Sequence, residues 1–159
     1  MRVSGFINNS VVNGIGIRDV LFLQGCEHHC KGCHNPQTWS TLHGVEADVS
    51  LVAERLRDNG NNVTISGGEP LLQYNELIQL LRILKEDNIN IWLYTGFTLE
   101  EIPEHRLKVL ADYVDVIVDG RFEEDKKDLT LRFRGSSNQR IIDLPKSVEL
   151  GKIVLWEEE

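Results

Sequence analysis

The sequence has few of the features that place a protein in or across a membrane. None of its 159 residues belongs to an apolar run long enough to span a bilayer, and its start lacks the charged, apolar and small-residue segments of a secretion signal. We therefore expect a cytoplasmic protein with no membrane partner. The length suits one hydrophobic core, so residues 1–159 are expected to form a single domain.

Positive charge is also scarce. The chain has 17 Lys and Arg against 25 Asp and Glu, which gives a net charge of −8 at neutral pH. A surface that binds the phosphates of nucleic acid needs the opposite balance, so nucleic acid is not an expected partner. The sequence also lacks an evident pair of carboxylates or a Ser/His/Asp set, which argues against acid–base and acyl-transfer enzymes.

Cysteine occurs at only three positions, Cys26, Cys30 and Cys33, all within the stretch CEHHCKGC. Three cysteines cannot all be paired in disulfides. In a reducing compartment, a group of neighbouring thiols is more often a metal site or a catalytic group than a crosslink. The stretch therefore predicts a metal site.

Two kinds of metal site fit three thiols. A structural zinc needs a fourth ligand, for which three histidines lie nearby: His28, His29 and His34. A 4Fe-4S cube held by three thiolates instead keeps one iron open to bind a reactant directly, which predicts chemistry. As ordinary loop residues, His28 and His29 are expected to be solvated.

Apolar segments alternate with amphipathic ones along the chain, with a period of roughly 25 residues. The expected strands cover residues 19–25, 62–68, 89–96 and 114–120. The expected helices follow Asp48 as N-cap, cover residues 75–86, and follow a capping box of Thr98 and Glu101. Residues 13–16 suit a hairpin turn, and residues 152–156 are expected to add one edge strand.

This alternation implies right-handed crossovers and a mostly parallel sheet, whose sites lie at the carboxyl ends of the strands. The expected fold class is therefore α/β. Because a closed eight-unit barrel takes about 250 residues, the chain is expected to form an open partial (β/α) barrel. One side of its cavity would then be uncovered, and a large substrate could close it from outside.

The cysteine stretch follows the first expected strand, and SGGEP at residues 66–70 follows a later one. This combination resembles the radical S-adenosylmethionine enzymes. The resemblance implies the open partial barrel of that family and a 4Fe-4S cluster held by Cys26, Cys30 and Cys33. It also implies a second cofactor, S-adenosyl-L-methionine, which binds the open iron and is split by an electron from the cluster into methionine and a 5'-deoxyadenosyl radical.

The resemblance also assigns residues to the methionine part of that cofactor. Gly67, Gly68 and Glu69 are expected at its amino group, because backbone carbonyls and a carboxylate are suitable acceptors. Glycines at the end of a strand let the backbone approach a ligand closely. On its own, GGEP would more often be a tight turn than a site.

The nucleoside part of the cofactor is expected at two other places. Backbone groups of Gly32, Cys33 and His34 are expected at the adenine, although many family members have an aromatic residue where this chain has Gly32. Asp119 ends a predicted strand, and its carboxylate is expected either to bind the ribose or to shape the turn at Gly120.

Within the superfamily, CHNPQTW at residues 33–39 resembles the enzymes that activate glycyl radical proteins. VNGIG, VDGRF and RGSSNQ narrow the resemblance to the activating components of anaerobic, class III ribonucleotide reductases. The implied function is to remove a hydrogen from a glycine of the reductase and leave a glycyl radical. The implied partners are the large catalytic subunit of that reductase and an electron donor such as flavodoxin.

RGSSNQ, at residues 134–139, has two interpretations. It is a polar surface turn, or it presents donors to a carboxylate or a partner backbone from Arg134, Ser136, Ser137 and Asn138. The resemblance favours the second interpretation. Two alternatives to the implied function stay open: a small-molecule radical enzyme of the deazaguanine synthase type, and a non-enzymatic zinc or iron–sulfur interaction module.

Overall fold

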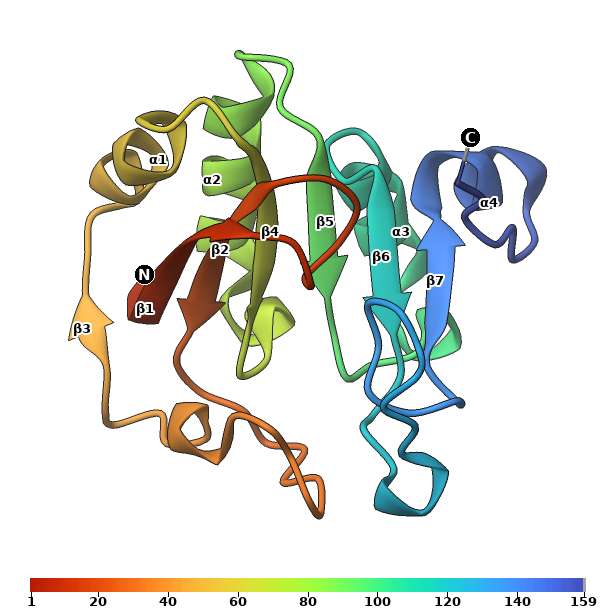
Figure 1. Ribbon diagram of the computed structural model, residues 1–159. Helices are drawn as coiled ribbons and strands as arrows, with labels where there is room; N and C mark the ends of the chain where they lie inside the picture. Colours follow the sequence, from red (N-terminus) through yellow and green to blue (C-terminus); the bar gives the residue numbers. More distant parts are fainter. Residues whose placement is uncertain (159) are drawn as a thin grey trace.

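Four parallel strands form the centre of the computed structural model, which describes residues 1–158 (Figure 1). They are β2 (Arg18–Leu23), β4 (Asn62–Gly67), β5 (Ile91–Tyr94) and β6 (Val116–Asp119). Most of their residues are buried, because both faces of the sheet are covered. This explains why the sequence shows apolar runs at these strands rather than strict alternation.

Antiparallel strands extend this centre on both sides. β1 (Arg2–Ser10) pairs with β2, β3 (Val45–Glu46) pairs with β1, and β7 (Arg140–Asp143) pairs with β6. The strand order is β3-β1-β2-β4-β5-β6-β7, and within residues 1–158 the two outer strands do not pair with each other. The prediction of an α/β fold around an open sheet with a parallel centre is confirmed.

The prediction of an edge strand at residues 152–156 is wrong. This segment lies beside β7 with one isolated bridge, Leu155 to Ile142, and two backbone hydrogen bonds, but it does not form a strand, and the edge strand is Arg140–Asp143 instead. The apolar character of the segment comes from packing, since the Trp156 ring lies 5.1 Å from the Trp92 ring, edge to face. A side chain that packs against an aromatic cluster gives the same apolar signal as a strand.

All four α-helices contribute to one core. They are α1 (Val49–Arg57), α2 (Tyr74–Lys85), α3 (Glu104–Ala111) and α4 (Leu144–Leu150). In Figure 1, α2 and α3 lie behind the strands, with α1 and α4 toward the two sides. Asp48 caps α1 as predicted, through a 2.9 Å bond from the Ser50 N–H. The capping box of Thr98 and Glu101 instead caps a short 3₁₀ turn, and α3 begins separately after Pro103.

Short 3₁₀ turns complete the secondary structure: η1 (Pro36–Thr38), η2 (Pro70–Gln73), η3 (Leu99–Glu101) and η4 (Glu124–Lys126). Three of them, η2, η3 and η4, follow the carboxyl ends of the central strands β4, β5 and β6. Every helix within residues 1–158 is too short or too polar to cross a bilayer.

The loop between β1 and β2 crosses the other face of the sheet, where it is drawn in red in Figure 1. Beneath it lies Arg18, which is fully buried and donates to Thr64 Oγ1 at 2.9 Å and to the Val63 carbonyl at 2.8 Å. Its guanidinium carbon lies 5.6 Å from the centre of the Trp92 ring, and burial lowers the pKa of Arg18 to about 10. This face of the sheet is therefore filled near the amino-terminal ends of the parallel strands, and space for a site is left near their carboxyl-terminal ends.

Candidate functional site

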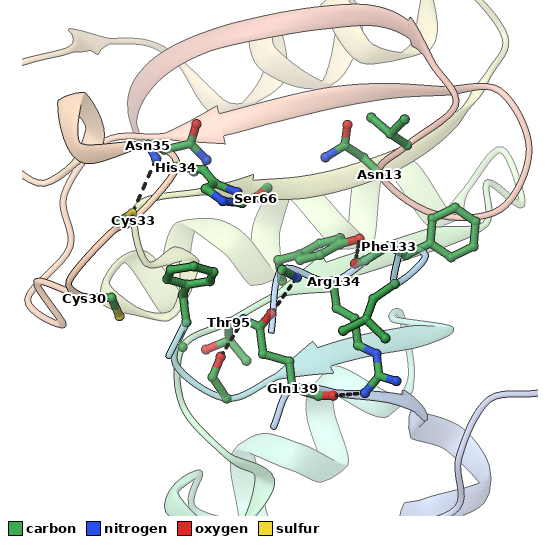
Figure 2. A pocket seen from close by; sticks show the side chains of 18 of the residues that line it. Asn13, Cys30, Cys33, His34, Asn35, Ser66, Thr95, Phe133, Arg134 and Gln139 are labelled. Atoms are coloured by element: carbon green, nitrogen blue, oxygen red, sulfur yellow. Dashed lines mark hydrogen bonds between the residues drawn. The ribbon is translucent and has the colours of Figure 1, made fainter. Parts of the chain in front are cut away.

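A cavity of about 720 Å³ opens at the carboxyl ends of the central strands. Segments that follow β2, β4, β5 and β6 line it, which is where ligands bind in open α/β sheets. Figure 2 shows Cys30, Cys33 and His34 on one side of this cavity, and Phe133 and Arg134 on the other. Residues that are distant in the sequence therefore meet here, as the sequence predicts.

The loop after β2, residues 24–40, carries the three cysteines. Hydrogen bonds close its base, from Gly25 N–H to the Thr38 carbonyl at 2.6 Å and from Cys26 N–H to the Trp39 carbonyl at 3.0 Å. The buried Gln24 amide adds two more, to the carbonyls of Gln37 and Ser40. The base of the loop is thus fixed to its own far end before any ligand binds.

All three cysteines are free thiols that line the cavity. Burial raises the pKa of the Cys26 thiol and of the Cys30 thiol, so the loop alone does not favour thiolates. Bound iron supplies the positive charge that deprotonates a coordinating thiol. Three soft ligands facing one cavity, with no fourth cysteine in the sequence, fit a cluster held by three thiolates.

The three histidines near the cysteines, the candidates for a fourth zinc ligand, have other contacts. His28 Nε2 lies 2.7 Å from Glu69 Oε1, the His29 ring packs against Trp39, and the His34 ring packs against Phe122. Within residues 1–158, no group of three or more His, Cys, Asp or Glu side chains is arranged to hold a single metal ion. The observed contacts of the histidines favour the cluster over the zinc site.

The two glycines of SGGEP lie at the end of β4, beside Ser66 on the cavity wall. Gly67 has a φ of 119°, and a Cβ there would overlap the backbone of Leu23. A Cβ on Gly68 would overlap the Gly25 carbonyl. Glycine is therefore required at both positions, because Gly67 packs against the end of β2 and Gly68 against the cysteine loop. Contact between these glycines and a cofactor stays a prediction.

Glu69 is buried beside the cavity, and its contact with the amino group of the cofactor stays a prediction. Its side chain is only 1% exposed and is not part of the cavity wall. Glu69 Oε1 accepts from His28, from the Thr95 hydroxyl at 2.9 Å and from the Gly96 N–H at 2.7 Å, while Oε2 accepts from the Leu71 N–H at 2.9 Å. The carboxylate is thus turned into the protein and is already fully bonded.

The sequence holds a signal for this position of Glu69. Pro70 occupies the first turn of η2, and the residue before such a proline is often a helix N-cap whose side chain accepts from the backbone. The expectation that His28 is solvated is wrong, because its side chain is only 7% exposed. The other partners of Glu69, Thr95 and Gly96, follow β5 and carry no motif that would have predicted them.

The region predicted for adenine contains an aromatic ring from another part of the chain. Gly32 has a φ of 75°, and a Cβ there would lie 3.2 Å from Phe122 Cε1. The Phe122 ring lines the cavity and lies 5.0 Å from the ring of His34. Phe122, of the VDGRF motif, therefore stands next to the position where many family members have an aromatic residue.

Asp119 is a buried structural residue in this geometry. Its carboxylate accepts from Arg140 Nε at 3.0 Å and Nη2 at 2.6 Å, and from the Leu99 N–H at 2.9 Å. Asp119 is not part of the cavity wall. These contacts join β6, β7 and η3, which agrees with a role in shaping the turn, and a contact with the ribose stays a prediction.

RGSSNQ is largely bonded to itself and to the segment after β6. Arg134 donates to the Gln139 carbonyl at 2.6 Å, and the Gln139 side chain accepts from the Gly135 and Ser136 N–H groups. The Asn138 amide donates to the Arg121 carbonyl at 2.8 Å. The donors expected to face a partner therefore mostly stabilise their own loop, although Arg134 also lines the cavity.

The loop also supports Phe122. A Cβ on Gly135 would lie 3.0 Å from Phe122 Cδ2, so glycine at this position makes room for the ring. The buried Ser136 hydroxyl accepts from the Glu123 N–H at 3.2 Å, and the Ser137 N–H donates to the Lys126 carbonyl at 2.9 Å. RGSSNQ thus holds the segment that carries Phe122 against the cavity.

Comparisons with known proteins agree with this site. A family model described as a 4Fe-4S single cluster domain matches residues 12–142. Three curated relatives are named anaerobic ribonucleoside-triphosphate reductase-activating protein. The relative from Pasteurella multocida (strain Pm70) is 37% identical, over 89% of this chain and 96% of its own length. The relative from Vibrio cholerae serotype O1 (strain ATCC 39315 / El Tor Inaba N16961) is 39% identical, over 82% and 90%.

The third relative, from Escherichia coli (strain K12), is 34% identical over 81% of this chain and 90% of its own length. The family model covers most of the chain, including the cysteine loop and the glycines that end β4. The chain therefore belongs to the family of anaerobic ribonucleoside-triphosphate reductase-activating proteins, which carry a 4Fe-4S single cluster domain.

Proposed function

We propose that this chain activates an anaerobic ribonucleotide reductase by radical S-adenosylmethionine chemistry. The observation that carries the proposal is the meeting of three free thiols and the glycine-rich end of β4 at one cavity, in a chain of this family. When bound, the 4Fe-4S cluster and S-adenosyl-L-methionine supply a 5'-deoxyadenosyl radical that takes a hydrogen from a glycine of the reductase. In this proposal the open seven-stranded sheet corresponds to a partial, unclosed barrel of the radical S-adenosylmethionine type.

The residues of the cavity wall have separate tasks in this proposal. Cys26, Cys30 and Cys33 hold the cluster, and the closed base of their loop keeps the thiols in place. The exposed backbone at Gly67 and Gly68 offers carbonyls to the amino group of the cofactor. Because Gly67 packs against the end of β2 and Gly68 against the cysteine loop, these carbonyls are preorganised, and little entropy is lost when the cofactor binds.

Phe122 provides the aromatic face for adenine in this proposal, in place of a side chain at Gly32. Three features support it: the ring lines the cavity, it lies beside His34, and glycines at positions 32 and 135 make room for it. Stacking on a ring suits a purine, because it uses the face of the base and leaves its edge for the backbone of Cys33 and His34.

The partner of this cavity is proposed to be a flexible glycine segment of the large reductase subunit. Two exposed apolar lips flank the cavity: Val11 and Val12 in the β1–β2 loop, which are 64% and 70% exposed, and Leu129, which is 85% exposed. A partner that covers these side chains also excludes water from the cavity. Hydrogen abstraction needs the reacting atoms about 3 to 3.5 Å apart, so the segment must enter between the lips.

The electron is proposed to come from a separate donor protein such as flavodoxin. Cys30 is only partly buried, and the neighbouring Lys31 side chain is 92% exposed. This side of the cysteine loop is therefore open to a second protein while the reductase occupies the cavity mouth.

The proposed function is tested by anaerobic reconstitution with iron and sulfide, followed by a strong reductant, S-adenosyl-L-methionine and the cognate large subunit. We expect about four irons per chain, release of 5'-deoxyadenosine, and the paramagnetic resonance doublet of a glycyl radical on the large subunit. A large subunit without its radical glycine is the control and should give no doublet. Consumption of a small molecule with no protein radical would favour the small-molecule alternative, and stoichiometric zinc in an active preparation would exclude the cluster.

A further inference from the structure

We propose that Glu69 and His28 are positioning residues: the buried carboxylate of Glu69 holds His28, and through it fixes the arm of the cysteine loop that joins Cys26 to Cys30. The inference rests on the proposed function, because it assumes that these cysteines bind the cluster. It assigns Glu69 to the loop that holds the cluster, and not to the amino group of the cofactor.

The first argument is the way the arm is attached. The backbone bonds that close the loop lie at its base, at Gly25 and Cys26. Within residues 1–158, the backbone of residues 27–32 makes no hydrogen bond to a segment outside the loop. The 2.7 Å contact between His28 Nε2 and Glu69 Oε1 therefore connects this arm to the end of β4. Both side chains are buried, at 7% and 1% exposed, so water competes little for the bond.

The second argument is the set of donors around Glu69. A buried carboxylate is stable only when its oxygens are bonded. Here the donors come from three separate places: the cysteine loop through His28, the start of η2 through Leu71, and the end of β5 through Thr95 and Gly96. One side chain thus joins three segments, two of which, the cysteine loop and the end of β5, line the cavity. An amino group of the cofactor would have to displace one of these bonds to reach it.

The third argument is that the protein has a fitted space for the imidazole of His28. A Cβ on Gly96 would lie 2.5 Å from His28 Cδ2 and 2.6 Å from Nε2, so any other residue at position 96 would push the ring away. The Phe97 ring meets the imidazole edge to face, with the ring centres 4.7 Å apart. The position of His28 is therefore fixed by packing as well as by its bond to Glu69.

The test uses four reconstituted variants of the full chain: His28→Leu, Glu69→Gln, their combination, and His28→Gln. Leucine removes the donor, whereas glutamine at position 28 keeps an amide donor of similar reach. His29→Leu is the matched control, because His29 is the exposed neighbour and has no bond to Glu69. The readouts are the rate of iron loss to a chelator, the paramagnetic resonance spectrum of the reduced cluster without cofactor, and the affinity for S-adenosyl-L-methionine.

We expect His28→Leu and Glu69→Gln each to change the cofactor-free spectrum and to accelerate iron loss roughly ten-fold, as for the loss of a hydrogen bond to a charged group. The double variant should be no worse than the more severe single one, because both act on the same bond. His28→Gln and His29→Leu should stay close to the parent chain.

Two results would overturn the inference. One is unchanged iron loss and an unchanged cofactor-free spectrum in both single variants. The other is a fall in S-adenosyl-L-methionine affinity in Glu69→Gln that His28→Leu does not show and that adds to the effect of His28→Leu in the double variant. That result would show that Glu69 contacts the cofactor. Failure of the parent chain to bind iron at all would contradict the proposed function instead, so the two proposals fail in different ways.

Discussion

In the proposed function, each of the three cysteines provides a ligand that no other residue near the cavity can replace. The histidines of the loop are held by Glu69, Trp39 and Phe122, so none is free to substitute for a thiol. We therefore expect Cys26→Ala, Cys30→Ala or Cys33→Ala to abolish both cluster binding and the cleavage of S-adenosyl-L-methionine. Iron analysis and a 5'-deoxyadenosine assay measure the two effects, and full cleavage in any one variant would exclude that cysteine as a ligand.

Phe122 is expected to contribute to cofactor affinity through its ring. Replacing Phe122 by Ala should weaken S-adenosyl-L-methionine binding by about 1 to 3 kcal/mol, the usual contribution of one base stacked on an aromatic side chain. Phe122→Leu keeps an apolar side chain but no ring, and Phe122→Trp keeps a ring. Equilibrium binding to the reconstituted chain should rank Trp near the parent and both Leu and Ala well below it. Equal affinity of the Leu variant and the parent would show that the ring does not stack on adenine.

At the residue scale, the sequence predicts residues that belong to a motif with fixed spacing. The cysteines and the two glycines of SGGEP lie on the cavity wall as expected. The contacts of Glu69 and His28 could not be predicted, because they depend on Thr95 and Gly96, which lie about one strand–helix unit further along the chain. Phe122 was missed for a similar reason, since its neighbours at positions 32, 34 and 135 meet it only after folding.

The β1–β2 loop packs closely against the sheet at one glycine and not at another. Gly14 has a φ of 119°, and a Cβ there would lie 2.9 Å from both Arg18 Cδ and Trp92 Cδ2. Gly16 also has a positive φ, of 79°, but a Cβ there would meet nothing within 4 Å. Alanine at Gly16 would therefore cause backbone strain alone, whereas alanine at Gly14 would cause both strain and a steric clash.

We expect Gly16→Ala to lower the free energy of unfolding by about 1 kcal/mol, from strain alone, and Gly14→Ala to lower it by about 2 to 4 kcal/mol, because the clash adds to the strain. Anaerobic urea denaturation of the two variants and the parent chain measures the difference. Equal losses would mean that the loop is not packed against Arg18 and Trp92.

At the element scale, strands and helices with strong periodicity are found close to their predicted positions, because burial of one helix face or of a whole strand leaves a clear pattern. β7 was missed because only Ile142 of its residues is fully buried, and Arg140 and Asp143 make it look like a loop. Residues 152–156 were taken for a strand because Trp156 packs on Trp92, a tertiary contact that has the same apolar signature.

On the scale of the whole molecule, one half of a sheet face is filled and the other half is open, and this arrangement decides from which side a substrate would enter the cavity. Arg18, Trp92 and the β1–β2 loop close the amino-terminal half, so the cavity opens only toward the carboxyl ends of the strands. The exposed lips at Val12 and Leu129 flank this opening. Large apolar side chains around a cavity mouth are typical of a surface that a protein partner covers.

The lips are expected to serve the partner and not the cofactor. Val12→Asp and Leu129→Asp should therefore leave cofactor cleavage within about two-fold of the parent, while the yield of glycyl radical on the large subunit falls at least ten-fold, the effect of about 1.4 kcal/mol in binding. Leu51→Asp is the matched control. Leu51 is exposed like the lip residues, at 61%, but it lies on α1 and is not part of the cavity wall. Cleavage is measured as 5'-deoxyadenosine without the large subunit, and radical yield by paramagnetic resonance with it. A normal radical yield in both lip variants would place the docking surface elsewhere, whereas an equal loss in Leu51→Asp would show that added negative charge, and not the lips, weakens the complex.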